Sequence, residues 1–161
     1  MVRKPRFEFA GAVYLARNRG NYRGDRFATA GAALAFVTCG GEACERMLWH
    51  VHADCLVRNH DHLALQKPRG NLVAGVYWLQ RTLGNRFNRY RGELGRESQG
   101  RSQAIVVEPS VHLACLVGDI DLNAVWARLV ELEQWEPFRW SSYRALGLGA
   151  DERAVWLSCE D

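Results

Sequence analysis

His60 and His62 are the two residues whose type and spacing most clearly suit the binding of a metal ion. Residues two apart in a β-strand project to the same face of the sheet, so the two imidazoles can reach one divalent ion. Such an ion can act as a Lewis acid on a phosphoryl oxygen. Two histidines are an incomplete site, and we expect the helix lying across that face to supply a third ligand. His50 and His52 repeat the spacing, so the pattern alone is weakly diagnostic.

Arginine dominates the positive charge of the chain. The net charge is +3, and Lys4 and Lys67 are the only lysines among its 21 cationic residues. The segment 81–101 contains six arginines against two glutamates. Guanidinium groups bind phosphates in a bidentate way, so this segment favours nucleic-acid binding. An ordinary solvated surface stays open as the alternative.

Length and composition indicate one globular domain. The 161 residues are 48% hydrophobic and 24% charged, which is ordinary for a folded domain. The five cysteines are an odd number without a C-x-x-C pair, as in a reduced protein. We find no apolar run long enough to span a membrane and no signal peptide. These features predict a cytoplasmic protein.

The first half of the chain reads as a strand, a helix and a hairpin of two strands. The predicted elements are a strand over 11–18, a helix over 28–46 and strands over 47–57 and 60–66. Gly40 and Gly41 predict an interruption of the helix. Alternation in the second strand places His50, His52 and Asp54 on one face.

The second half adds a long amphipathic helix, a fourth strand and a helical, aromatic C-terminal part. The predicted elements are a helix from Asn71, as its N-cap, to about Tyr90, a strand over 103–108, and one or two helices over 111–132. The order β-α-β-β-α-β predicts a ferredoxin-like antiparallel sheet with helices on one face and an extra C-terminal helix. We expect one domain, with a core over about 8–132 and a tail over 133–161.

Four short motifs follow one another along the chain in an order more specific than any one of them. They are Asn59-His60-Asp61-His62-Leu63, Phe87-Asn88-Arg89, Gln99-Gly100-Arg101 and Trp140-Ser141-Ser142-Tyr143. From about residue 5 to 147, the chain resembles the REP-associated tyrosine transposases of the single-tyrosine HUH transposase superfamily. The resemblance implies a ferredoxin-like domain that cuts and rejoins single-stranded DNA beside small hairpins.

The same resemblance implies a metal-assisted reaction with a covalent intermediate. His60 and His62 match the histidines that, with a third ligand, hold Mg²⁺ or Mn²⁺ in that family. A helix tyrosine attacks the phosphodiester and forms a 5′-phosphotyrosine. We place the tyrosine of the family pattern T-Y-T-x-R-F-N-R at Leu83, which has no oxygen to attack with. Cleavage is therefore expected to be lost or impaired.

Several residues are candidates to complete or replace parts of this site. Tyr90 and Tyr77 are weak substitutes for the nucleophile, and Asn88 is the candidate third ligand. Asp54 stands where the family pattern H-A-Y-C-L has tyrosine, and it and Asp61 would add negative charge beside the histidines. The expected DNA contacts are Arg81, Arg86, Arg89, Arg101, Arg19, Trp140 and Tyr143.

Three functions stay open at this point. The first is a transposase-related protein that binds hairpin or single-stranded DNA but has lost cleavage. The second is an active nuclease or transposase with an unusual tyrosine. The third is an eroded interaction module that does not bind DNA. Whether the protein is a monomer or a homodimer is undecided.

Overall fold

A computed structural model describes residues 8–20, 25–67, 69–91, 102–131, 138–146 and 157, with the backbone alone for 90, 91 and 146. The strands are β1 (Val13–Arg19), β2 (His50–Val57), β3 (His60–Gln66) and β4 (Gln103–Val107). The helices are α1 (Ala30–Met47), α2 (Leu72–Arg91), α3 (Val111–Asp121), α4 (Asn123–Trp126) and α5 (Tyr143–Leu146).

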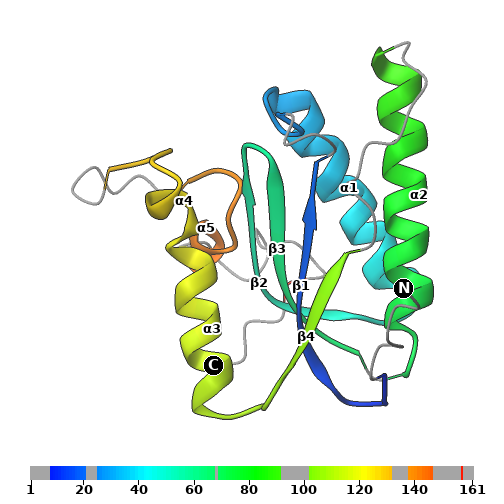
Figure 1. Ribbon diagram of the computed structural model, residues 1–161, viewed down its shortest axis with the longest axis vertical. Helices are drawn as coiled ribbons and strands as arrows, with labels where there is room; N and C mark the ends of the chain where they lie inside the picture. The colour runs from blue at the N-terminus through cyan, green and yellow to red at the C-terminus, as the bar shows by residue number, and fades with distance from the viewer. Residues whose placement is uncertain are drawn as a thin grey trace, which may run out of the picture.

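The four strands form one antiparallel sheet in the order β2-β3-β1-β4 (Figure 1). The central strands β1 and β3 pair along their whole lengths, from Val13 opposite Gln66 to Arg19 opposite His60. This order, with α1 after β1 and α2 after β3, confirms the predicted ferredoxin-like α+β fold.

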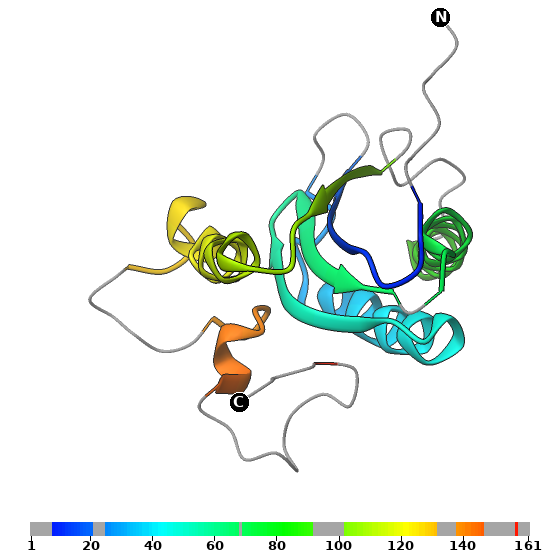
Figure 2. The ribbon, with the colours of Figure 1, turned by 90° about the horizontal axis from the view of Figure 1, so that it is seen from below.

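Helices cover both faces of the sheet (Figure 2). The helices α1 and α2 pack side by side on one face, where their apolar residues join those of β1, β2 and β3 in the larger core. The helices α3 and α4 lie on the opposite face and pack on β2 and β3 around Ile120 and Ala124. The predicted helices on one face are α1 and α2, and the predicted extra C-terminal helix is on the other. We call these the α1/α2 face and the α3/α4 face.

The helix α1 runs without a break through Gly40 and Gly41, so the predicted interruption is wrong. The hydroxyl of Thr29 accepts a hydrogen bond from the Ala32 amide and caps the first turn, and the helix ends at Leu48 in a left-handed conformation. Most helix stability in a folded protein comes from packing of the apolar face, which here outweighs the low propensity of two glycines.

A β-bulge at His52 overturns the predicted alternation of β2. Val51 pairs with Leu65, but Ala53 pairs with Ala64, so one extra residue lies between the two pairs. A bulge of this kind shifts every later side chain to the other face. Val51 consequently belongs to the larger core and Ala53 to the smaller one. The predicted grouping of His50, His52 and Asp54 on one face is therefore wrong.

Asn71 stands at the predicted N-cap position, where its backbone carbonyl accepts from the Gly75 amide at 2.9 Å, but its side chain joins α1 to α2 instead of capping the helix. The side-chain carbonyl oxygen accepts from the indole N–H of Trp49 at 3.0 Å, and the side-chain amide donates to the Met47 carbonyl at 2.9 Å. Glu8 takes the capping role, because its carboxylate accepts from the Val73 amide at 2.6 Å. A carboxylate at this position also suits the positive end of the helix dipole.

Residues of the C-terminal part lie along the outer edge of β2. The Leu56 amide donates to the Trp140 carbonyl at 2.8 Å, and the Ser142 amide donates to the Asp54 carbonyl at 2.9 Å. The tail thus pairs with part of an edge strand that would otherwise expose unpaired backbone groups.

Candidate nucleic-acid interface

His60 and His62 project together from the α3/α4 face of the sheet. They alternate with Leu63 and Leu65, which belong to the larger core, and share the side of Ala64, which belongs to the smaller one. Their ring centroids are 4.8 Å apart. The prediction that one strand presents both imidazoles on one face of the sheet is confirmed.

Two arginines of β1 stand opposite the two histidines. Arg17 pairs with His62 and Arg19 with His60 in the antiparallel register, and directly paired residues share a face. Both arginines are exposed. The Arg17 guanidinium also donates to the side-chain oxygen of Gln103 on β4 at 3.2 Å, which holds it over the sheet. The α3/α4 face therefore carries two guanidinium groups directly beside two imidazoles.

The imidazoles are held in their neutral form. Burial, then the charge of His60 and that of Arg17, lowers the pKa of His62 to about 4. Burial and the nearby charges of Arg17 and Arg19 also lower the pKa of His60. Since neither ring carries charge at neutral pH, the positive potential here comes from the arginines.

Hydrogen bonding leaves ring nitrogens available. Nδ1 of His60 lies 2.6 Å from the side-chain oxygen of Asn59, a contact that fits a proton on Nδ1 and a lone pair on Nε2. Among the described residues, Nε2 of His62 is buried and has no hydrogen-bond partner. A buried polar atom without a partner is uncommon in a folded protein.

These donors make only part of a metal site. Across the residues that the structure describes, no group of three or more histidine, cysteine, aspartate or glutamate side chains could hold an ion. The structure does not bring Asn88 to the pair, because α2 packs on the opposite face. Two guanidinium groups beside the imidazoles also disfavour a divalent cation. The described residues therefore do not complete a metal site.

The helix that lies across the histidine face is α3, and it contains no tyrosine. Leu83, the predicted nucleophile position, is fully buried in the larger core between α2 and the sheet. Tyr77 is 63% exposed on the same helix, and the side chain of Tyr90 lies outside the described part of the chain. The structure thus places Leu83 and Tyr77 on an element that packs on the far side of the sheet from His60 and His62.

The acidic residues predicted beside the histidines point the other way. Asp61 lies on the α1/α2 face, where its carboxylate accepts from Arg26 at 3.2 Å and from Asn18 at 2.8 Å. The amide of Gln80 in turn donates to Asn18 at 2.6 Å. Burial raises the pKa of Asp61 to about 6, although Arg26 and Asn18 lower it in part. Asp54 also lies on that side, so the predicted negative charge beside the imidazoles is wrong.

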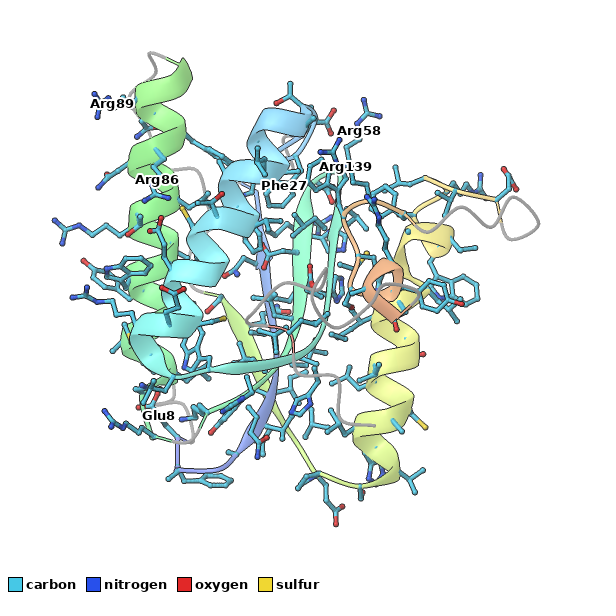
Figure 3. All side chains as sticks on the ribbon, turned by 180° about the vertical axis from the view of Figure 1, so that it is seen from behind. Glu8, Phe27, Arg58, Arg86, Arg89 and Arg139 are labelled. Atoms are coloured by element: carbon cyan, nitrogen blue, oxygen red, sulfur yellow. The ribbon has the colours of Figure 1, made fainter. Side chains whose placement is uncertain are left out.

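The predicted arginine contacts fall into separate places. Arg86 is bound to α1: its guanidinium donates to both carboxylate oxygens of Glu42 at 2.9 Å and to the sulfur of Cys39 at 3.1 Å. Arg81 and Arg89 are exposed on α2. Figure 3 shows Arg86 against α1 and Arg89 further along α2. Only Arg19 of the predicted set lies beside the histidines, and Arg101 falls outside the described residues.

Trp140 is half-buried against the larger core, and the guanidinium of Arg139 lies 4.9 Å from its ring centroid. Tyr143 begins the short helix α5 and is half-buried.

The sequence alone did not identify Arg17 as a site residue, because its place beside His62 depends on the pairing of two strands whose partners lie 45 residues apart. The alternation of β1, with Arg17 and Arg19 two residues apart, was the available signal.

The fold and the face defined above place the chain in the class of ferredoxin-like α+β domains with a histidine pair on a central strand. The structure of a REP-associated tyrosine transposase bound to a REP hairpin has the same fold. The TM-score is 0.71 at 14% sequence identity, and the match covers 90% of this chain and 84% of that one. No family model and no curated protein sequence matches the chain. Within the described residues, no helix is long and apolar enough to cross a membrane.

Proposed function

We propose that this protein binds single-stranded or hairpin DNA through the α3/α4 face of its sheet and does not cut the strand through a tyrosine. The observation that carries the proposal is the register of β1 against β3, which places Arg17 and Arg19 beside His62 and His60. The likeness to a transposase structure solved with a hairpin supports the choice of ligand.

The chemistry of this face suits a phosphate chain. Arg17 and Arg19 are two residues apart on one strand and exposed, so they can bind successive phosphates of one DNA strand. The half-buried imidazole of His60 adds a ring nitrogen, Nε2, that can accept a hydrogen bond from the ligand. Positive charge comes from fixed guanidinium groups, so binding of this kind depends on salt more than on pH near neutrality.

The placement of the helices supports the proposed loss of tyrosine chemistry. A nucleophile must approach within about 3–3.5 Å of the phosphorus atom, so it must lie on the face that binds the DNA. The helix α3 covers that face without a tyrosine, and Tyr77 lies on α2, which covers the other. An active enzyme that uses Tyr77 is therefore disfavoured.

Binding is tested with a fluorescently labelled hairpin that carries a single-stranded extension. Anisotropy titrations at 50–200 mM KCl are expected to show affinity falling steeply with salt. The double variant Arg17→Gln/Arg19→Gln should reduce the slope of log K against log[salt] by about 2. The matched control is Arg81→Gln/Arg89→Gln, which removes the same charge from α2 and should change the slope less.

The outcomes separate the open functions. Equal slopes for the two double variants would show that the DNA interface does not lie on the histidine face. A failure of the wild type to bind DNA at any salt would favour a module that does not bind DNA. Incubation with the hairpin and Mn²⁺, followed by denaturing electrophoresis, should give no covalent protein–DNA adduct. Formation of a covalent protein–DNA adduct would instead favour an active transposase.

A further inference from the structure

A pocket of about 120 Å³ lies on the far side of β2 from the proposed DNA interface. Val37 of α1, Asp54 of β2 and Trp140 contribute to its walls, and Arg139, Ala145 and Leu157 also line it. One water needs only about 10–15 Å³ of such space, so the pocket admits a group of several heavy atoms. The pocket stands between the edge strand and the C-terminal tail.

The Asp54 carboxylate in this pocket lacks a partner. The residue is 7% exposed, and its backbone N–H and C=O are both bound to Ser142. No hydrogen bond or ion pair to its carboxylate exists within the described part of the protein. Arg139 lines the same pocket but turns its guanidinium over the ring of Trp140. A carboxylate that lines a pocket without a protein donor can accept hydrogen bonds from a ligand that enters it.

Burial and the nearby carboxylates of Asp121 and Asp61 raise the pKa of Asp54 to about 7. The group is therefore partly ionised at neutral pH and ready to be stabilised as a carboxylate by a ligand that donates hydrogen bonds.

The surroundings of the carboxylate indicate what kind of ligand enters. Trp140 provides an aromatic wall, and Val37, Ala145 and Leu157 provide apolar ones, which suit a flat ring. Arg139 is exposed at the pocket, and Figure 3 shows it toward the same end of the molecule as Arg58, near the turn between β2 and β3. His60 and Arg19 lie at that end of the sheet. A DNA strand bound there could extend round the edge of β2 and reach the pocket.

We propose that this pocket binds one unpaired guanine of the DNA, with the Asp54 carboxylate accepting hydrogen bonds from the base. Among the four bases, guanine alone presents two adjacent donors on its Watson–Crick edge, N1–H and the 2-amino group, which match the two oxygens of a carboxylate. Trp140 then lies against the ring, and Arg139 neutralises the attached phosphate. The inference rests on the proposed DNA binding and adds base selection to it.

The test uses hairpins whose single-stranded extension is all thymine except for one variable base, titrated by anisotropy at pH 8. The wild type should bind the guanine extension about tenfold more tightly than the adenine, cytosine or thymine ones. Hypoxanthine, which keeps N1–H but lacks the 2-amino group, should fall between them. Asp54→Asn should remove the preference and leave affinity for the all-thymine extension unchanged.

Two further variants keep the result interpretable. Glu45→Gln removes the same charge from an exposed site on α1 and should retain the preference. Ala145→Leu fills the pocket without a change of charge and should abolish it. Circular dichroism confirms that each variant is folded. Salt-dependent hairpin binding without a preference for guanine, or with a preference that survives in Asp54→Asn, would overturn this inference and leave the proposed function standing. Absence of hairpin binding would overturn both.

Discussion

The two faces of strand β3 differ in how their polar side chains are bound. On the α1/α2 face, the buried Asp61 accepts hydrogen bonds from both Arg26 and Asn18, and Leu83 fills the core beside them. On the α3/α4 face, Nε2 of His62 is buried without a partner, and Arg17 beside it is exposed. The same strand, β3, supplies Asp61 to one face and His62 to the other.

The difference separates stability from binding. Removing one partner of a buried ion pair is costly, whereas exposed guanidinium groups can bind an external phosphate. Asp61 and Arg26 therefore contribute to stability, and the arginines beside the histidines present charge to a ligand. Substitutions on each face can test this division.

The largest effect is expected from breaking the buried ion pair of the α1/α2 face. Arg26→Ala leaves the Asp61 carboxylate buried without its charged partner, and this should reduce the free energy of unfolding by about 3–5 kcal/mol. Urea denaturation at pH 7 measures it. The exposed pair of Arg58 and Asp25 is the control, since Arg58→Ala should cost less than about 1 kcal/mol. Similar losses for the two variants would contradict the comparison.

Leu83→Tyr tests the same face and places a tyrosine at the position of the family's nucleophile. Leu83 is fully buried, so a larger, polar ring there should destabilise the protein by about 1–3 kcal/mol. It should form no covalent adduct with hairpin DNA, because α2 packs on the opposite face from the histidines. Leu83→Met conserves volume and should cost under about 1.5 kcal/mol. An adduct with the tyrosine variant would show that the helices rearrange around DNA.

Asp54→Asn is expected to stabilise the free protein in a pH-dependent way. The pKa of Asp54 is raised to about 7 in the folded state, so folding is weakened as pH rises from its unfolded value of 3.8 to about 7. The variant should therefore be more stable than the wild type at pH 8, on the order of 1–2 kcal/mol since the carboxylate faces a pocket, and similar at pH 3.5. Thermal unfolding at the two pH values measures this. A variant that is less stable at pH 8 would argue for an internal partner of the carboxylate.

The smallest effect on stability at pH 7 is expected for His62→Gln, under about 1 kcal/mol, because the imidazole nitrogen has no internal bond to lose. Below pH 6.5, the unfolded state takes up a proton that the folded His62 accepts only near pH 4, so the wild type loses stability in acid. The variant should lack this part of the loss. Urea denaturation at pH 7 and 5 checks the sign, and loss of DNA affinity in the variant would place His62 at the interface.

Local patterns predicted much of the fold. The strand over 60–66 has the predicted bounds, and the long helix begins and ends within one residue of those predicted. The break at Gly40 and the alternation of β2 were wrong, because packing of a whole helix and a bulge at His52 are set by neighbours distant in sequence. The tail that closes the edge of β2 likewise depends on a pairing across more than 80 residues.

The sequence by itself determined the order of the elements, the shared face of His60 and His62, and the excess of arginine, because each depends on residue types and on spacing along one strand or helix. Only the tertiary structure decided which helix covers the histidines, which arginines stand beside them, and where the carboxylates of Asp54 and Asp61 point. The alternation of a strand predicts which residues share a face of the sheet, but it does not predict which helix covers that face. That assignment follows from how the two cores pack on either side of one sheet.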